Sequence, residues 1–207
     1  MLAIIQARSN SKRFKNKVLK LINNTPLIVH VKNQVDKSKF VKKIIVSTSK
    51  KKTDDNLVKI LKIYKIPFFR GDLHNVSKRL LETSKKYNSK YFIRINGDSP
   101  LIDFKIINRA IKIHQNRKVD YDIVTNVFPR TFPKGQSVEI IRSLILQKNM
   151  KKFSIFDKEH VTTYFYKNYS NFNIKNFKSK KASKEVDQVV DYPRDLKLIS
   201  KMFKNKL

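Results

Sequence analysis

The sequence predicts an α/β protein with a mostly parallel sheet and helices on both of its faces. Apolar or alternating runs of strand length are separated by runs whose apolar residues recur at helical spacing. This alternation favours parallel strands joined by right-handed crossovers, which place helices on both faces. The 207 residues are 40% apolar and contain no internal repeat or Pro/Gly/Ser-rich linker. We therefore expect one continuous domain, residues 1–207.

The first half of the chain shows the clearest alternation. Strands are expected at residues 2–6, 43–48, 67–69, 91–95 and 122–126. Helices are expected between them, at residues 26–38, 54–64, 76–87 and 104–117. Ligands of such sheets bind at the carboxyl ends of the strands. The loops that follow the first and fourth strands are therefore candidates for a binding site.

The second half has a less regular pattern. Residues 137–141 are expected to form a strand that leads into a helix at 142–150. After these, the sequence predicts a helix at 157–168, an edge strand at 171–177, a charged and mobile loop at 178–185, a strand at 186–190 and a helix from about Pro193.

The charge of the chain has two interpretations. The 37 Lys and 10 Arg residues give a net charge of +31. Such a charge is typical of nucleic-acid-binding proteins. A compositional bias toward Lys, Asn and Ile produces the same charge, and here the lysines are scattered along every segment. We prefer the bias, and we expect no specific nucleic-acid partner.

Composition also limits the compartment and the kinds of site. The chain has no cysteine, which excludes disulfides and thiolate metal sites. No apolar run is long enough to span a bilayer, and the N-terminus lacks the pattern of a secretory signal. We therefore expect a cytoplasmic protein without membrane insertion.

The loop after the first strand is rich in cations. The stretch ARSNSKRFKNK contains Arg8, Lys12, Arg13, Lys15 and Lys17. Arg grips two oxygens of an anion at once, whereas Lys acts as a point charge. A solvated basic loop is the alternative. The position directly after a strand favours an anion-binding loop.

Five segments resemble the sugar-activating cytidylyltransferases, in the order in which that family has them. The first is the loop ARSNSKRFKNK, and the others are NGDSPLID, RTFPKGQSVEII, KEHVTTYF and VVDYPRDL. The family includes the acylneuraminate and 3-deoxy-manno-octulosonate cytidylyltransferases and the branch of the spore-coat polysaccharide synthesis protein F. Five motifs in register over nearly the whole chain are a specific signal.

The resemblance implies a glycosyltransferase-A-like, Rossmann-related fold and a nucleotidyltransferase activity. The expected reaction joins CTP and an acidic sugar into a CMP-sugar and pyrophosphate, with Mg²⁺, for surface glycan synthesis. GTP in place of CTP is left open, because base choice depends on a few loop contacts. Relatives commonly form dimers, and residues 130–168 are where we expect the partner of a homodimer to pack.

The resemblance also assigns roles to individual residues. Arg8, Lys17 and Asp98 are expected to be catalytic, and Asp98 and Asp191 to bind Mg²⁺, which prefers few carboxylates and phosphate oxygens. For the nucleotide the expected residues are Arg8, Ser11, Arg13, Lys17, Arg70 and Arg79, and for the sugar they are Glu139, Glu159 and His160.

Several of these residues also have a structural interpretation. Asp98 lies in good turn chemistry, and Asp191 is placed to cap the last helix. His160 is as consistent with a structural role as with a catalytic one. Asp103, after the motif NGDSPLID, is expected to cap a helix, and Asp187 stands where a basic residue is expected.

The loop departs from the family pattern at its glycines. Asn10 and Asn16 replace glycine, and Lys15 replaces proline. Asn is the next most tolerant residue for a left-handed turn, but its side chain hinders close approach of the backbone to phosphate. A nucleotide-binding relative without turnover is therefore an alternative to the enzyme.

Overall fold

Seven strands form one mixed sheet. The computed structural model describes residues 1–11, 13–116, 119–179 and 186–204. Across the sheet the order is β5 (Phe68–Gly71), β4 (Lys43–Ser49), β1 (Leu2–Gln6), β6 (Tyr91–Asn96), β8 (Glu139–Arg142), β7 (Ile123–Thr125) and β9 (Ile174–Asn176). Within the part described, β8 is antiparallel to β6 and β7, and the other pairings in this sheet are parallel. The prediction of a mostly parallel sheet is confirmed.

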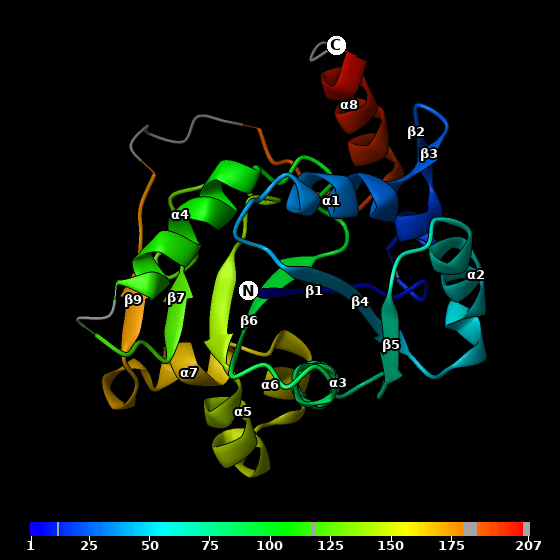
Figure 1. The fold of residues 1–207 in the computed structure, drawn as a ribbon. Coiled ribbons are helices and arrows are strands. Elements are labelled where there is room, and N and C mark those ends of the chain that lie inside the picture. The colour runs from blue at the N-terminus through cyan, green and yellow to red at the C-terminus, as the bar shows by residue number, and fades with distance from the viewer. Residues whose placement is uncertain (12, 117–118, 180–185, 205–207) are drawn as a thin grey trace.

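Helices cover both faces of the sheet, as the sequence predicted (Figure 1). One face is covered by α1 (Leu27–Asp36), α2 (Asp55–Ile63) and α4 (Phe104–Gln115), and α8 (Pro193–Lys204) lies on the same side, outside α1. The other is covered by α3 (Val76–Lys86), α5 (Ser143–Asn149), α6 (Ile155–His160) and α7 (Thr163–Lys167).

The alternation of side chains along β1 builds the two cores. Ala3 and Ile5 are buried in the core on the α1 side, and Leu2 and Ile4 in the core on the α3 side. Successive residues of a strand point to opposite faces, so a strand that is apolar throughout is buried on both. Burial on both faces fixes β1 inside the sheet, between β4 and β6. The start of the loop that follows β1 is fixed with it.

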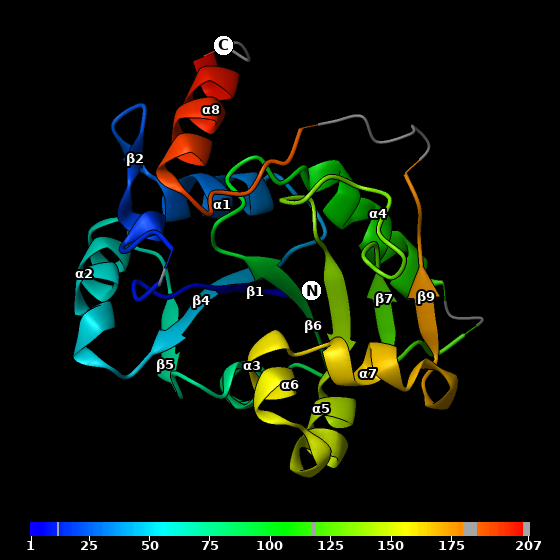
Figure 2. The ribbon, with the colours of Figure 1, turned by 180° about the vertical axis from the view of Figure 1, so that it is seen from behind.

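Short elements complete the fold. A hairpin of β2 (Leu21–Ile22) and β3 (Thr25–Pro26), which the sequence did not predict, contacts α8 beside it (Figure 2). The 3₁₀ turns are η1 (Lys17–Leu19), η2 (Lys52–Asp54), η3 (Met150–Lys152) and η4 (Tyr169–Asn171).

The predicted helix at 157–168 is wrong in its bounds and its continuity. A capping box, in which Ser154 and Asp157 bond reciprocally, starts the helix at Ile155. The helix then ends at His160, because Val161 has φ 46° and ψ −56° and interrupts the helical hydrogen bonds. A second short helix, α7, follows.

The predicted strand at 186–190 is also wrong. This segment is extended but pairs with no strand of the described chain. Its backbone N–H groups bond loops instead: Gln188 donates to the carbonyl of Lys134 over 2.7 Å, and Val190 to that of Asp98 over 2.9 Å. The segment therefore lies across the carboxyl edge of the sheet.

The predicted loop at 178–185 lies outside the described residues except for 178 and 179. The edge strand predicted at 171–177 is confirmed as β9, which lies at the end of the strand order. Among the helices described, none is long and apolar enough to cross a membrane.

Candidate active site

A cavity of about 380 Å³ opens at the carboxyl ends of β1 and β6. Four segments surround it: the loop after β1, the loop after β6, the 130–137 loop before β8, and the end of α6. The segment 186–191 closes one side through Val189 and Asp191. The cavity therefore lies where the sequence placed the site. Of the predicted site residues, its lining includes Arg8, Ser11, Arg13, Lys17, Arg79, Asp98, Glu159, His160 and Asp191.

A buried carboxylate anchors the loop after β1. Asp54 is fully buried, and its Oδ1 accepts a hydrogen bond of 2.6 Å from the backbone N–H of Ser9. Its Oδ2 accepts bonds from the backbone N–H and the hydroxyl of Ser49, at 3.1 and 2.5 Å. Asp54 was not predicted as a functional residue, because it stands at the start of the helix expected at residues 54–64.

Asn16 takes the left-handed conformation that glycine would provide. Its φ is 57° and its ψ 25°, and its N–H donates to the carbonyl of Ser9 over 2.8 Å. Asn tolerates this region better than most residues. Asn10 is exposed and is not among the described residues with positive φ. Only one of the two glycine replacements therefore occupies a position with a conformational demand.

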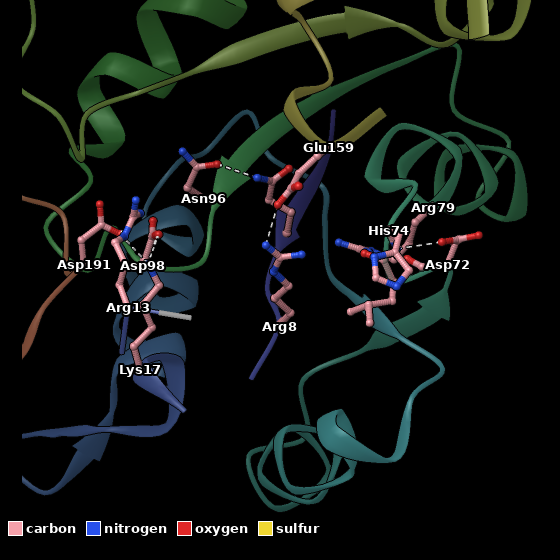
Figure 3. A network of polar contacts seen from close by, with 12 residues as sticks. Arg8, Arg13, Lys17, Asp72, His74, Arg79, Asn96, Asp98, Glu159 and Asp191 are labelled. Carbon is pink, nitrogen blue, oxygen red and sulfur yellow. Dashed lines mark hydrogen bonds and ion pairs between the residues drawn. The ribbon is translucent and has the colours of Figure 1, made fainter. Parts of the chain in front are cut away.

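Lys17 joins two carboxylates that are far apart in the sequence (Figure 3). Its Nζ donates to Asp98 Oδ2 over 2.7 Å and to Asp191 Oδ1 over 2.8 Å, and its side chain is 10% exposed. Arg13 donates to the same Asp191 oxygen over 2.7 Å. The cluster therefore brings together the loop after β1, the loop after β6 and the segment 186–191.

The two carboxylates determine the charge state of this cluster. Burial lowers the pKa of Lys17, but the charges and hydrogen bonds of Asp98 and Asp191 outweigh it, so the net pKa is raised. Burial raises the pKa of Asp191, and Lys17 and Arg13 together bring it below its ordinary value. Lys17, Arg13 and Asp191 are therefore charged at neutral pH. Asp191 Oδ1 accepts from both Lys17 and Arg13. The cap at the start of α8 comes instead from Asp195, whose carboxylate accepts from the N–H groups of Asp191 and Tyr192.

Arg8 and Glu159 form a second ion pair in the cavity. Arg8 donates to Glu159 Oε1 over 2.6 Å, and the two side chains are 36% and 44% exposed (Figure 3). Burial raises the pKa of Glu159, but Arg8 outweighs it and lowers the net value. His160 also lines the cavity and packs against Phe156, with ring centroids 4.1 Å apart and the rings tilted by 39°.

The two arginines expected near the nucleotide are placed differently. Arg79 is buried and lines the cavity. It donates hydrogen bonds to the carbonyls of Asp72 and Leu73, and its Nε has no partner within the described chain. Burial lowers the pKa of Arg79 to about 10. Arg70 does not line the cavity. Its guanidinium is held by the carbonyls of Ser49 and Lys51 and by the carboxylate of Asp55.

Glu139 lies behind the cavity wall and not in it. Its Oε2 accepts from Arg94, which lines the cavity, and its Oε1 accepts from Tyr166 over 2.5 Å. Arg94 also donates to Gln6 Oε1 over 2.9 Å, and Gln6 in turn donates to Asn96 over 2.9 Å. The sequence missed Arg94, although a cation within the strand YFIRIN was a usable signal.

The loop before β8 supplies two further cations that the sequence did not assign. Arg130 and Lys134 both line the cavity, and Lys134 pairs with Asp187 over 3.2 Å. Gly135, with φ 94°, lies so close to Gln188 that a Cβ would be 2.3 Å from its carbonyl oxygen. The absence of a side chain at Gly135 therefore lets segment 186–191 lie against the loop, where Gln188 donates to the carbonyl of Lys134. Asp187 is thus a partner of this loop, and Asp103 caps α4 as predicted.

The donor set suits Mg²⁺ only together with a ligand. Among the described residues, no group of three or more His, Asp or Glu side chains is placed to hold a metal ion. Mg²⁺ in nucleotide sites takes one or two carboxylates, phosphate oxygens and water. Asp98 and Asp191 share the Lys17 ammonium, so two carboxylates already converge on one cationic position. This arrangement fits the ion.

A mostly parallel sheet with a cation-lined cavity at the carboxyl ends of its strands defines an α/β nucleotidyltransferase fold. The chain belongs to the cytidylyltransferase family, whose model matches residues 2–206.

Individual relatives agree with this assignment. The spore coat polysaccharide biosynthesis protein SpsF of Bacillus subtilis is 29% identical over 170 residues, which cover 79% of this chain and 69% of that protein. A 3-deoxy-manno-octulosonate cytidylyltransferase of Geotalea daltonii is 31% identical over 111 residues, 53% of this chain and 42% of that enzyme. The structure of a cytidylyltransferase from Leptospira borgpetersenii matches with a TM-score of 0.94 at 26% identity, covering 100% of this chain and 87% of that one.

Proposed function

We propose that the protein transfers a cytidylyl group from CTP to a hydroxyl of an acidic sugar, releasing pyrophosphate, for surface glycan synthesis. The observation that supports this most directly is the contact of Lys17 with both Asp98 and Asp191, beside Arg13 and Arg8. Such a group of cations and carboxylates is the chemistry that a magnesium triphosphate requires.

In this proposal the side chains bind and neutralise the triphosphate. Arg8, Arg13 and Lys17 hold its oxygens while the sugar hydroxyl attacks the α-phosphorus, the new O–P bond forms and the bond to pyrophosphate breaks. Asp98 and Asp191 would hold Mg²⁺, which supplies further charge neutralisation on the phosphates when bound. Ser11 and Arg79 line the same cavity and are expected to complete the nucleotide site.

The remaining cations of the cavity support an anionic acceptor. Arg94, Arg130 and Lys134 line it in addition to the residues assigned to the triphosphate. The relative from Geotalea daltonii is by its name specific for a sugar acid, 3-deoxy-manno-octulosonate. His160 and Glu159 lie at the same cavity and are available for the hydroxyls of the sugar. The alternative without turnover rests on the lost glycines, and the left-handed Asn16 weakens it.

A pyrophosphate-release assay tests the proposal. The four nucleoside triphosphates are each combined with Mg²⁺ and with 3-deoxy-manno-octulosonate, N-acetylneuraminate or a neutral hexose. We expect release with CTP and a sugar acid, and none with the hexose. Thermal shifts with each triphosphate separate binding from turnover. If CTP stabilises the protein but no sugar gives pyrophosphate release, the alternative of a nucleotide-binding relative without turnover is favoured. If GTP alone stabilises the protein, its nucleotide is GTP and not CTP.

We further propose that the protein is a homodimer that packs through residues 130–168. Leu144, Ile155 and Phe156 lie in this segment and expose 39%, 87% and 54% of their surface. Apolar side chains gathered on one segment are typical of an interface. Sedimentation equilibrium of the protein and of Ile155→Asp checks this. A monomer at all concentrations contradicts it.

A further inference from the structure

The ion pair of Arg8 and Glu159 places a carboxylate inside the cavity on one of its cations. Arg8 comes directly after β1, and its amino group donates to Glu159 over 2.6 Å. A guanidinium binds a carboxylate and a phosphate through the same fork of N–H groups. The two anions therefore cannot both satisfy the same face of Arg8. Both residues line the cavity, and Figure 3 shows the pair apart from the cluster of Lys17.

We infer that Glu159 is an internal competitor of the nucleotide, which holds Arg8 in the free protein and is displaced by a triphosphate. Glu159 then sets the affinity for nucleotide instead of adding to it. The inference rests on the proposed function only in taking the ligand to be a triphosphate.

The charges make this exchange feasible. Both side chains are partly exposed, at 36% and 44%, and ion pairs this exposed to water are weak. A triphosphate offers several negative charges to the cations of the cavity, so it outweighs one exposed carboxylate. The lowered pKa of Glu159 means that the competitor is ionised at neutral pH. Protonation therefore does not remove the competing charge of Glu159 at neutral pH.

The backbone around Glu159 is fixed, so the side chain is the part that moves. The hydroxyl of Ser77 on α3 lies 3.2 Å from the carbonyls of Asp157 and Lys158, which anchors α6. Behind it, Thr162 donates to the carbonyl of His160 over 2.5 Å, around Val161 at φ 46° and ψ −56°. This is a γ-turn of the strained, positive-φ kind. A buried β-branched residue in such a turn has few alternative conformations.

It follows that displacement needs no lid. Rotation of one side chain releases Arg8 and leaves the Glu159 carboxylate at the cavity beside His160, where an acceptor hydroxyl is expected. Nucleotide binding would thus free a group on the acceptor side before the sugar binds.

Calorimetric titration of Mg²⁺–CTP and of Mg²⁺–tripolyphosphate into wild type and Glu159→Gln tests the inference. Glu159→Gln keeps the size of the side chain and removes its charge. We expect both ligands to bind about three- to tenfold more tightly, since the competing pair and its repulsion are lost. In the Arg8→Gln background, Glu159→Gln should give a smaller gain, because only the repulsion between the carboxylate and the phosphates is left to remove.

Glu82→Gln is the matched control, because removing any carboxylate raises the net charge. Glu82 is 40% exposed in a surface pair with Lys78, away from the cavity. An equal gain for Glu82→Gln, or an undiminished gain for Glu159→Gln in the Arg8→Gln background, would overturn the inference. If tripolyphosphate responds as expected but CTP does not bind, the proposed nucleotide is wrong and the competitor stands. If neither ligand binds any variant, both fail.

Discussion

At the scale of single residues, the site is built from charges that compensate one another. Lys17 is nearly buried, and burial alone would favour its neutral form. Asp98 and Asp191 reverse that preference, and Arg13 shares Asp191. Removing Lys17 would therefore take the ammonium from both carboxylates, which is costly where water is excluded.

Asp98→Asn should lower pyrophosphate release by at least about 100-fold, because the carboxylate charge for the metal and for Lys17 is lost while the shape is kept. The assay with CTP and the accepted sugar measures this, and thermal unfolding checks that the fold is intact. Asp103→Asn is the control. Asp103 caps α4 through the N–H of Lys105, and Asn caps equally well. If Asp98→Asn and Asp103→Asn are similarly active, Asp98 is a turn residue and does not bind the metal.

Asn16→Ala should lower the free energy of unfolding by about 1 kcal/mol, because a Cβ residue without a compensating side-chain amide is disfavoured at positive φ. Asn16→Gly should be neutral or stabilising in the same denaturant titration. The same exchange at the exposed Asn10, which lacks positive φ, serves as the reference. Equal losses for Ala and Gly at position 16 would contradict the turn geometry.

At the scale of elements, the loops and helix ends decide which side chains meet. Segment 186–191 crosses the carboxyl edge of the sheet because its N–H groups bond the loops after β6 and before β8. That crossing brings Asp191 to Lys17. The capping box at Ser154 and the turn at Val161 likewise fix where α6 begins and ends, and so aim Glu159 and His160 at the cavity.

His114 makes the contact of α4 with β6 sensitive to pH. Its ring lies 4.4 Å from that of Tyr91, and its buried Nδ1 has no partner in the described part of the chain. Burial lowers the pKa of His114 below 6.5, and this outweighs the nearby Asp120. The helix C-terminus would favour a charged ring, so burial also overcomes the helix dipole.

Because the folded state has the lower pKa, the unfolded chain binds the proton first as the pH falls below 6.5. The stability that neutral His114 contributes is fully present above pH 6.5. It is lost as the pH falls from 6.5 to the pKa of the folded state. We expect the Tm to fall between pH 7.5 and 5.5 in wild type, and to fall less in His114→Phe, which keeps an aromatic ring. Equal decreases in Tm would contradict the effect of burial.

At the scale of the whole molecule, the net charge of +31 serves the site only in part. The cations of the cavity are largely arginines and Lys17 with named partners. Many other lysines are exposed on helices and loops, which is what a compositional bias produces. The three glycines of the chain are all at close approaches, such as Gly97, where a Cβ would lie 2.8 Å from that of Ala7. The bias has therefore spared the positions where a side chain does not fit.

If the lysines reflect bias, duplex DNA should bind only weakly and without sequence preference at about 0.15 M salt, because counterion release then offers little free energy. Fluorescence anisotropy with two unrelated duplexes, at low and at high salt, measures this. Tight binding that distinguishes the duplexes would indicate a nucleic-acid function instead.

The sequence by itself determined the alternation of strands and helices, the position of the cation-rich loop after β1, and the motif that contains Asp98. These features depend on local hydrophobic pattern and on where strands end, and both are readable over a few residues. Asn16 was also recognised as a tolerated replacement for glycine.

Only the tertiary structure decided which of these side chains meet. Lys17 and Asp191 are 174 residues apart and Arg8 and Glu159 are 151, and a contact of about 3 Å depends on the packing of everything between them. The same packing removed Arg70 from the cavity and placed Glu139 behind Arg94. The local hydrophobic pattern determines the helices and strands. How the loops meet across the edge of the sheet depends on backbone hydrogen bonds between distant segments, which no local pattern encodes.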